Sequence, residues 1–170
     1  GDVMQDAALF YANKAQHPDF LLPEHFILAT LHRAENTDSP ESLQSIIAAL
    51  EEIAREMPVV IPIHPRTRKK LQELNFNFKQ TRLQLVDPVG YLEMVYLLKH
   101  CSLVATDSGG LQKEAYFFKK YCITLRTETE WVELVEQGAN IITGWRYEDI
   151  LNSYKQLKHT TKDVFSSPLY

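Results

Sequence analysis

The chain has 170 residues, of which 45% are hydrophobic and 24% are charged, and its formal net charge is −4. This length and composition fit one globular domain with a hydrophobic core, and the acidic balance argues against nucleic acid as a partner. No apolar run approaches the roughly 20 residues that a membrane span needs, and no charged-then-apolar leader opens the sequence. We therefore expect no membrane partner.

Short apolar runs alternate with helical periodicity along the chain. In chain order, the sequence predicts a helix at residues 2–15, a strand at 26–31, a helix at 40–53, a strand at 59–63, a helix beginning at the basic cluster 66–70, a strand at 83–86, a helix at 91–99, a strand at 103–106, a helix at 111–118, a strand at 122–125, a helix at 130–136, a strand at 140–142 and a helix at 147–158. This alternation predicts an α/β fold with a doubly wound, parallel, six-stranded, Rossmann-like sheet that helices cover on both faces.

The two cysteines of the chain lie beside predicted buried strands. Cys101 precedes the strand at 103–106, and Cys122 begins the strand at 122–125. Cysteines in such positions usually act as small hydrophobic core residues. We therefore expect no disulfide and, because disulfides are rare in reducing compartments, a cytoplasmic protein.

The run ATDSGGLQKE at residues 105–114 carries the strongest functional signal. Ser108 is a good N-cap for the following helix, and Gly109 and Gly110 allow the backbone to approach a ligand closely. The first amides of that helix and the positive end of its dipole suit a phosphate group. Glu114 lies about one turn further on, where its carboxylate can accept hydrogen bonds from sugar hydroxyls. A plain strand-to-helix turn also needs small residues, so the run alone leaves both interpretations open.

Further polar segments follow the other predicted strands. The first strand is followed by HRAEN at residues 32–36, the second by HPR at 64–66, the fourth by DSGG at 107–110 and the fifth by RTETE at 126–130. If the strand order is 3-2-1-4-5-6, the carboxyl ends of strands 1 and 4 flank the crevice in which such folds bind ligands. The convergence of these segments at one sheet edge favours a site for an anionic, hydroxyl-rich ligand.

The arginines and histidines at this edge also have a purely structural interpretation. Arg33 or Arg126 can simply pair with Glu35 or Glu128, and a lone histidine after a strand often hydrogen-bonds to a loop backbone. The prediction of a ligand site therefore depends on the convergence of the segments and not on any one residue.

Two other kinds of site are disfavoured by the same residues. A metal site formed by His32, His64 and Asp107 lacks the short His/Cys spacing of typical zinc sites, so we expect no metal. A nucleophile elbow at Ser108 needs a preceding glycine pattern, which the segment before Gly109 does not have.

Five segments resemble, in order and spacing, the non-hydrolysing UDP-N-acetylglucosamine 2-epimerases. These segments are LHRAENT at residues 31–37, PIHP at 62–65, DPVGYL at 87–92, TDSGGLQKEA at 106–115 and LRTETE at 125–130. The match runs over nearly the whole chain. The resemblance implies that the chain is the C-terminal, UDP-binding half of a two-domain, GT-B-like enzyme that needs no cofactor.

The resemblance also implies the domain organisation and the reaction. Residues 1–22 correspond to an interdomain segment and helix, residues 23–160 to the UDP-binding domain, and residues 161–170 to a truncated C-terminal segment. The reaction removes the proton at sugar C2, eliminates UDP and adds it back with C2 inverted. The missing N-terminal domain brings most of the acid–base carboxylates, so we expect this half alone to be inactive and the full-length enzyme to be a homodimer.

The resemblance assigns roles to ten residues. The catalytic candidate is His32, and the substrate-binding candidates are Arg33, Asn36, His64, Met94, Ser108, Gly109, Gly110, Glu114 and Arg126. Residues 108–110 are expected to donate hydrogen bonds to the phosphates, and Glu114 to hold the ribose hydroxyls. Met94 and the segment 87–92 are expected near the uracil, and Arg126 near the phosphates or the sugar.

Several departures from the family pattern concern the sugar. Ala34 stands where many members carry a second arginine, and Trp131-Val132 stands where many carry Arg-Pro. The loss of two cations and the gain of an indole beside the sugar pocket favour relatives that act on modified UDP-sugars, such as UDP-2,3-diacetamido-glucuronic acid. Lys120-Tyr121 replaces a common Lys-Pro or Val-Pro and is expected to affect only a turn.

Two alternative functions share parts of this pattern. Retaining UDP-sugar glycosyltransferases often carry two glutamates eight positions apart, whereas Thr106 and Cys122 stand eight positions from Glu114. A non-catalytic UDP-sugar binding module is favoured by the missing half. The sequence favours the epimerase function over either alternative.

Overall fold

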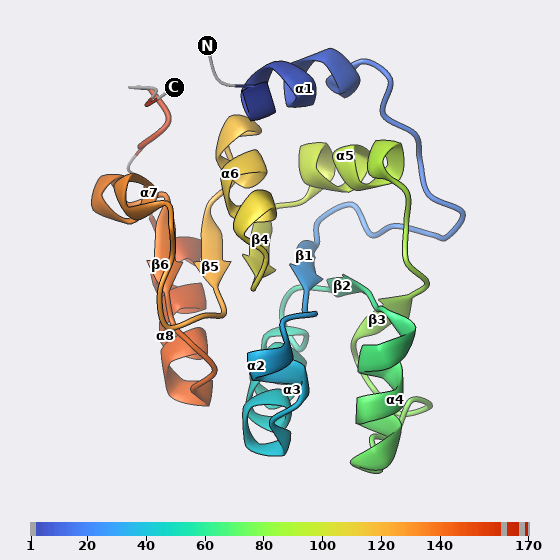
Figure 1. The fold of residues 1–170 in the computed structure, drawn as a ribbon. Coiled ribbons are helices and arrows are strands. Elements are labelled where there is room, and N and C mark those ends of the chain that lie inside the picture. The colour runs from blue at the N-terminus through green and yellow to red at the C-terminus, as the bar shows by residue number, and fades with distance from the viewer. Residues whose placement is uncertain (1–2, 161–162, 167–168, 170) are drawn as a thin grey trace.

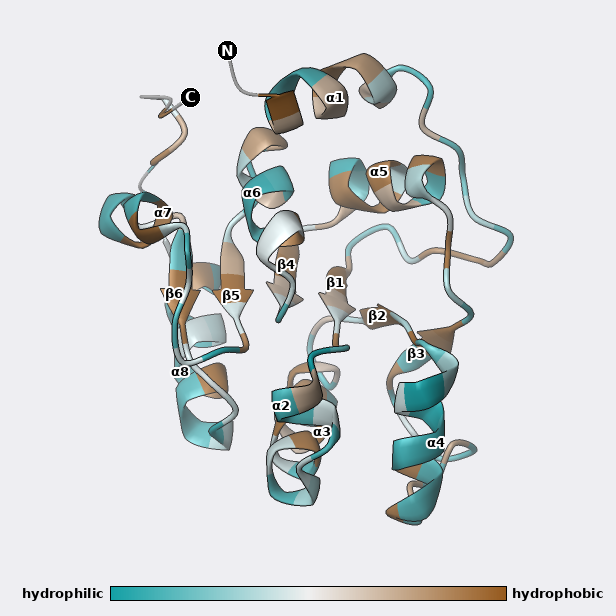
Figure 2. Ribbon diagram, in the orientation of Figure 1, coloured by the Kyte–Doolittle hydropathy of each residue, from teal (hydrophilic) through white to brown (hydrophobic). Residues whose placement is uncertain are grey.

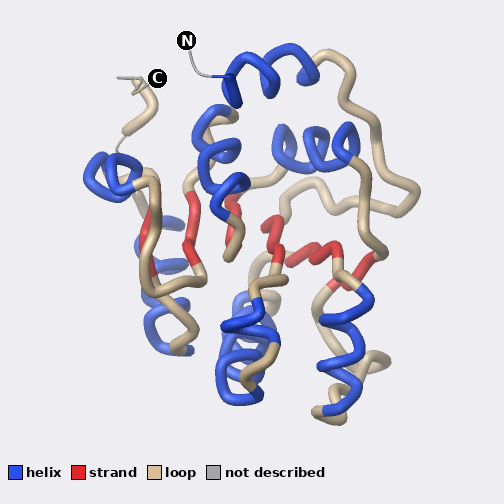
Figure 3. The backbone as a smooth tube through the Cα atoms, in the orientation of Figure 1, coloured by secondary structure: helices blue, strands red, loops and turns tan. Residues whose placement is uncertain are grey.

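The computed structural model describes residues 3–160, 163–166 and 169 of the chain. The first two residues of the predicted interdomain segment, and residues 161–162, 167–168 and 170 of the predicted C-terminal segment, lie outside the described residues. The structure shows an α/β arrangement in which the strands lie between layers of helices, drawn in red and blue in Figure 3.

The described residues form one parallel sheet. Its strands are β1 (Ile27–Thr30), β2 (Val59–Pro62), β3 (Gln84–Val86), β4 (Leu103–Thr106), β5 (Cys122–Thr124) and β6 (Asn140–Ile142). The strand order is β3-β2-β1-β4-β5-β6, and every neighbouring pair is parallel (Figure 1). The doubly wound, six-stranded sheet that the sequence predicts is therefore confirmed, with each strand within about a residue or two of its expected position.

The helices also follow the predicted pattern. They are α1 (Val3–Ala12), α2 (Ala34–Thr37), α3 (Pro40–Ile53), α4 (Pro65–Glu73), α5 (Tyr91–His100), α6 (Gly109–Phe117), α7 (Val132–Gln137) and α8 (Tyr147–Lys158). The sequence does not predict α2, because four residues are too few to show a helical period. The sequence places the start of α7 two residues too early, because the amide of Trp131 bonds to the Thr129 hydroxyl before the helix begins.

Alternate residues of each strand enter different hydrophobic cores, as the two-residue period of a strand requires. Ile27 and Ala29 of β1 belong to the core that α3 and α8 complete, whereas Leu28 belongs to the core that α5 and α6 complete. Helix α1 packs outside α5 and α6, so the sheet has an additional helical layer on that side (Figure 1). Figure 2 shows the hydrophobic strands between helices such as α4 whose residues are largely hydrophilic.

Side-chain caps fix where three of the helices begin. Ser39 Oγ accepts a hydrogen bond from the Ser42 amide at 3.2 Å, with Pro40 at the first helical position of α3. His64 Nδ1 likewise accepts from the Arg66 amide at 3.0 Å at the start of α4. The third cap, Ser108, belongs to α6. The starts of α4 and α6 therefore lie at the carboxyl edge of the sheet, next to the ends of β2 and β4.

Two further observations concern the cysteines and the helices. Cys101 and Cys122 are buried and free, and burial raises the pKa of each thiol to about 12, so both remain neutral core residues. Among the helices that the structure describes, none is long and apolar enough to cross a membrane.

Candidate functional site

A cleft opens at the carboxyl edge of the sheet, where β1 and β4 lie side by side with Thr30 opposite Thr106. Its volume is about 350 Å³. The cleft is lined by Thr30, Leu31, His32, Pro62, His64, Pro88, Val89, Met94, Ser108, Gly110, Leu111 and Glu114. Because β1 and β4 are the strands at which the order of the sheet reverses, the cleft occupies the crevice where doubly wound folds bind ligands.

The structure brings together residues from four segments that the sequence singled out. The predicted site residues in the cleft wall are His32, His64, Met94, Ser108, Gly110 and Glu114. The other predicted residues lie outside the cleft wall and are Arg33, Asn36, Gly109 and Arg126.

The first turn of α6 presents free hydrogen-bond donors beside the cleft. The Ser108 amide donates to Thr106 Oγ1 at 2.9 Å, and the Ser108 hydroxyl oxygen accepts from the Leu111 amide at 3.2 Å. The amides of Gly109 and Gly110 have no acceptor among the residues that the structure describes. These two amides, the hydroxyl hydrogen of Ser108 and the helix dipole together form a site suited to an anion such as phosphate.

Glu114 places a carboxylate in the same cleft. The Tyr91 hydroxyl, at the start of α5, donates a hydrogen bond to Glu114 Oε2 at 3.2 Å. Burial raises the pKa of Glu114, and the Tyr91 hydrogen bond partly opposes that rise. Burial and the neighbouring carboxylate in turn raise the pKa of Tyr91 to about 12. Sequence analysis missed this contact, because Tyr91 and Glu114 lie on different helices.

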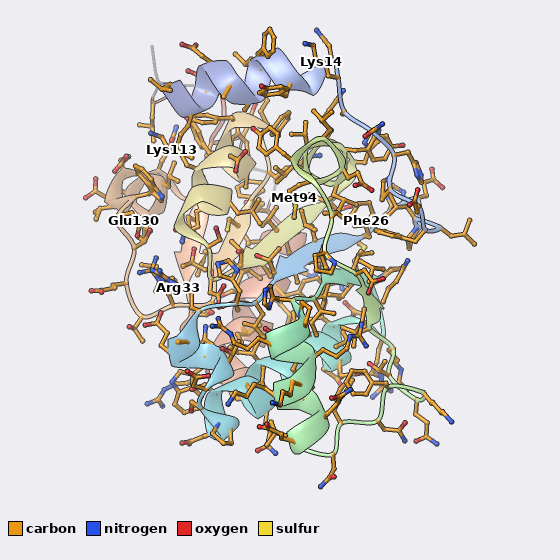
Figure 4. The ribbon with its side chains drawn as sticks, turned by 45° about the vertical axis from the view of Figure 1, so that its right-hand side comes forward. Lys14, Phe26, Arg33, Met94, Lys113 and Glu130 are labelled. Carbon is orange, nitrogen blue, oxygen red and sulfur yellow. The ribbon has the colours of Figure 1, made fainter. Side chains whose placement is uncertain are left out.

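Part of the cleft wall is apolar. Pro88 and Val89 come from the loop before α5, and Met94 comes from α5 itself, as its position under that helix in Figure 4 indicates. Pro62 and Leu111 complete the apolar surface. A flat heterocyclic ring is suited to such a surface.

Asp107 organises the cleft from beneath. Its side chain is fully buried and accepts hydrogen bonds from the backbone amides of His32 (3.1 Å) and Arg33 (3.0 Å) and from Asn36 Nδ2 (3.2 Å). His32 Nδ1 lies 3.6 Å from Asp107 Oδ1, and the imidazole is half exposed. Sequence analysis did not assign this role. The available signal is an aspartate directly after a buried strand, where a carboxylate must find internal donors.

Asn36 and Arg126 are held by neighbours behind the cleft wall. Besides Asp107, the Asn36 amide donates to the Leu125 carbonyl at 2.8 Å. Arg126 is buried, with Nη1 3.0 Å from Glu130 Oε2 and Nε 3.6 Å from Glu35 Oε1. Of the two pairings that the sequence left open for Arg126, the one with Glu35 forms, and the second carboxylate comes from Glu130 and not from Glu128.

The indole of Trp131 lies against the first turn of α6. Trp131 does not line the cleft; its Nε1 donates to the Gly109 carbonyl at 2.6 Å. Among the described residues there is also no group of three or more His, Cys, Asp or Glu side chains that could hold a metal ion.

Comparison with known proteins decides the family. The sequence model of the UDP-N-acetylglucosamine 2-epimerase family matches residues 1–168. The chain belongs to this family. The resemblance that the sequence motifs indicate is thus confirmed, and four of the five motifs line the cleft.

Two relatives match most of this chain. It is 55% identical over 155 residues to the UDP-2,3-diacetamido-2,3-dideoxy-D-glucuronate 2-epimerase of Pseudomonas aeruginosa, covering 90% of this chain and 43% of the relative. It is 45% identical over 163 residues to a UDP-N-acetylglucosamine 2-epimerase homologue of Methanococcus maripaludis, covering 90% and 45%. The chain therefore spans less than half the length of these curated relatives.

A solved structure shows the same fold. The crystal structure of the Methanocaldococcus jannaschii UDP-GlcNAc 2-epimerase in complex with UDP-GlcNAc and UDP superposes with a TM-score of 0.86 and 36% identity. The superposition covers 98% of the present chain and 50% of the Methanocaldococcus jannaschii chain. The predicted fold, one half of a GT-B-like epimerase, is confirmed.

Proposed function

We propose that the chain is the UDP-binding half of a UDP-sugar 2-epimerase that inverts C2 by elimination and re-addition of UDP. The observation that carries the proposal is the cleft itself. The free amides of Gly109 and Gly110 begin α6 beside the cleft, Pro88, Val89 and Met94 give the cleft an apolar surface, and Glu114 lines it as well. A nucleoside diphosphate contains the matching chemical groups, which are a flat ring, a ribose diol and two phosphates.

Each part of UDP has a partner in this arrangement. The uracil ring lies against Pro88, Val89 and Met94, and the ribose hydroxyls donate to Glu114. The phosphates accept hydrogen bonds from residues 108–110. The sugar then extends toward His32, and the remaining predicted residues, including Arg126, act from behind the cleft wall or on the sugar. The crystal structure of the Methanocaldococcus jannaschii enzyme with UDP-GlcNAc and UDP supports UDP as the class of ligand.

The first turn of α6 supports the chemical step in this proposal. A base removes the C2 proton, the C2–H electrons form a C1=C2 double bond, and the C1–O bond breaks with its electron pair leaving on UDP. Negative charge therefore grows on the β-phosphate, where fixed amides and a helix N-terminus stabilise it without reorganisation. The reverse steps add UDP back to C1 and deliver a proton to the opposite face of C2.

The substrate we infer is a modified UDP-sugar of the 2,3-diacetamido-glucuronic acid type. The 55% identity to the Pseudomonas aeruginosa enzyme of that name supports this inference. Ala34, in place of an arginine that the resemblance leads one to expect, supports it as well. The proposal assigns three further features to the full-length enzyme: the acid–base carboxylates, the homodimer and the closed cleft.

Isotope exchange tests the reaction. In D₂O, the full-length enzyme should introduce deuterium at C2 of UDP-2,3-diacetamido-glucuronic acid and do so more slowly with UDP-GlcNAc, as mass spectrometry would measure. The isolated 170-residue chain should bind UDP but exchange no deuterium, because one wall of a cleft neither excludes water nor completes the catalytic set. Transfer of sugar to an acceptor would instead indicate a glycosyltransferase. Binding by the full-length protein without turnover would indicate a binding module.

His32→Asn tests the catalytic candidate in the full-length enzyme. Asparagine keeps hydrogen-bonding ability but cannot take up a proton, and Asp107 remains to hold the loop backbone. We expect His32 to assist by contact with the substrate, so KM should rise while kcat at saturation stays within about tenfold of wild type. A fall in kcat of about 10²–10⁴-fold with unchanged UDP affinity would instead make His32 a proton-transfer group.

A further inference from the structure

The loop between β5 and α7, residues 125–131, packs directly on the first turn of α6. Trp131 Nε1 donates to the Gly109 carbonyl at 2.6 Å, and Thr129 Oγ1 donates to Gln112 Oε1 at 2.7 Å. Gln112 is buried and also accepts from Asn140 Nδ2 of β6 at 3.0 Å. Two hydrogen bonds thus join the loop to α6. One of them, at Gln112, is also linked to β6 through Asn140.

Gly109 is the point of closest approach between this loop and α6. A Cβ atom at position 109 would lie 1.9 Å from Glu130 Oε1, so the carboxylate rests against the glycine Cα. Arg126 Nη1, 3.0 Å from Glu130 Oε2, holds that carboxylate in place. A side chain at position 109 would therefore displace Glu130. This steric requirement for glycine is separate from any contact with a ligand.

The indole of Trp131 is itself held by its surroundings. The Lys113 ammonium, which is buried, lies 4.4 Å from the centroid of the Trp131 ring. The Trp131 amide donates to Thr129 Oγ1 at 3.1 Å. Figure 4 shows Lys113 on α6, with Glu130 below it on the neighbouring loop. The cation–π contact with Lys113 and the backbone hydrogen bond to Thr129 therefore hold the indole so that its N–H points to the Gly109 carbonyl.

The hydrogen bond to the Gly109 carbonyl reaches the cleft through one peptide unit. The Gly109 carbonyl and the Gly110 amide belong to the same planar group, and in a trans peptide they point in opposite directions. Fixing the carbonyl against Trp131 therefore fixes the direction of the Gly110 N–H, and Gly110 lines the cleft. A hydrogen bond accepted by the carbonyl also polarises the peptide and strengthens the amide as a donor.

We propose that Trp131 is a positioning residue, whose indole N–H orients the Gly110 amide for the pyrophosphate of the ligand. The inference rests on the proposed function, because it names what the oriented amide binds. Trp131 does not line the cleft, so it acts through Gly109 and does not touch the ligand. It would thus stabilise the leaving diphosphate from outside the cleft.

Trp131→Phe in the 170-residue chain tests the proposal, because phenylalanine keeps an aromatic ring at this position and removes the indole N–H. Calorimetry should show UDP binding weakened about three- to tenfold, the usual effect of one neutral hydrogen bond, with uridine binding unchanged. Trp145→Phe is the matched control. Trp145 is partly buried, and its indole N–H forms no hydrogen bond with the described residues, so neither affinity should change.

A second measurement does not require a ligand. In ¹⁵N NMR spectra of the free chain, the Gly110 amide resonance should shift in Trp131→Phe and stay in place in Trp145→Phe, with Gly90 as an internal reference. An unmoved Gly110 resonance would overturn the positioning role whether or not UDP binds. Equal weakening of UDP and uridine would also overturn it, because that result indicates general loosening. If Trp131→Phe shifts the Gly110 resonance but the wild-type chain binds no UDP, the ligand named here and the proposed function are both overturned. The hydrogen bond between Trp131 and Gly109 would still orient the Gly110 amide.

Discussion

Replacing Asp107 with asparagine should lower the free energy of unfolding by about 2–4 kcal/mol, the largest stability effect that we expect from one conservative change. The carboxylate is fully buried and accepts hydrogen bonds from the backbone amides of His32 and Arg33 and from the Asn36 side chain. An amide at this position would turn one N–H group toward these donors. At least one of them would then be left buried without an acceptor.

Urea unfolding followed by circular dichroism measures this effect, with Asp38→Asn as the control. The Asp38 side chain is 57% exposed and lies 3.8 Å from Lys70 Nζ, so its replacement should change the free energy of unfolding by less than about 0.5 kcal/mol. A loss below about 1 kcal/mol in Asp107→Asn would show that Asp107 does not hold the loop after β1 in the way the structure indicates.

Replacing Glu114 with alanine should cause the largest loss of ligand affinity, about 10–150-fold for both UDP and uridine. Hydrogen bonds to a charged group are worth about 1.5–3 kcal/mol, and Glu114 is assigned to the ribose, which both ligands contain. Ser108→Ala should weaken UDP binding less, because it removes one hydrogen bond to a phosphate whereas Glu114→Ala removes those of both ribose hydroxyls, and it should leave uridine binding unchanged because uridine has no phosphate.

Calorimetry on the 170-residue chain, with Glu136→Ala as the control, separates these assignments. Glu136 is exposed on α7, far from the residues that line the cleft, so both affinities should be those of the wild type. Equal losses of uridine affinity in Glu114→Ala and Ser108→Ala would contradict the separate roles. Unchanged uridine affinity in Glu114→Ala would remove Glu114 from the ribose site.

The pH dependence of uridine binding follows from the same carboxylate. Only the ionised form of Glu114 accepts hydrogen bonds from both ribose hydroxyls, so affinity should be constant at high pH and fall as the pH drops through the pKa of Glu114. Burial raises that pKa above its ordinary value, so the fall should begin at a higher pH than for an exposed glutamate. Tyr91→Phe removes a hydrogen bond that lowers the pKa of Glu114, and the fall should then begin at a still higher pH. Uridine is used because the phosphates of UDP also titrate.

The sequence by itself determined the sheet and the position of the proposed anion site. Buried parallel strands are continuous apolar runs, and their alternation with helices restricts the topology to a few arrangements. The features of the anion site lie within residues 105–114, so the strand end, the Ser108 cap, the two glycines and Glu114 are all local signals. Local rules of capping and backbone freedom were therefore sufficient to predict where α6 begins and what its first turn offers.

The tertiary structure alone decided how this first turn is held and which charges balance one another. Asp107 accepts from a backbone amide 75 positions away, and Trp131 donates to a carbonyl 22 positions away. Neither partner can be identified from the residue itself, because an aspartate after a strand or a tryptophan in a loop has many possible neighbours. Likewise Arg126 pairs with Glu130 and not Glu128, because the path of the loop over Gly109 brings only the former carboxylate to the guanidinium. Local sequence determines which groups are available, whereas the packing of distant segments determines which of them meet.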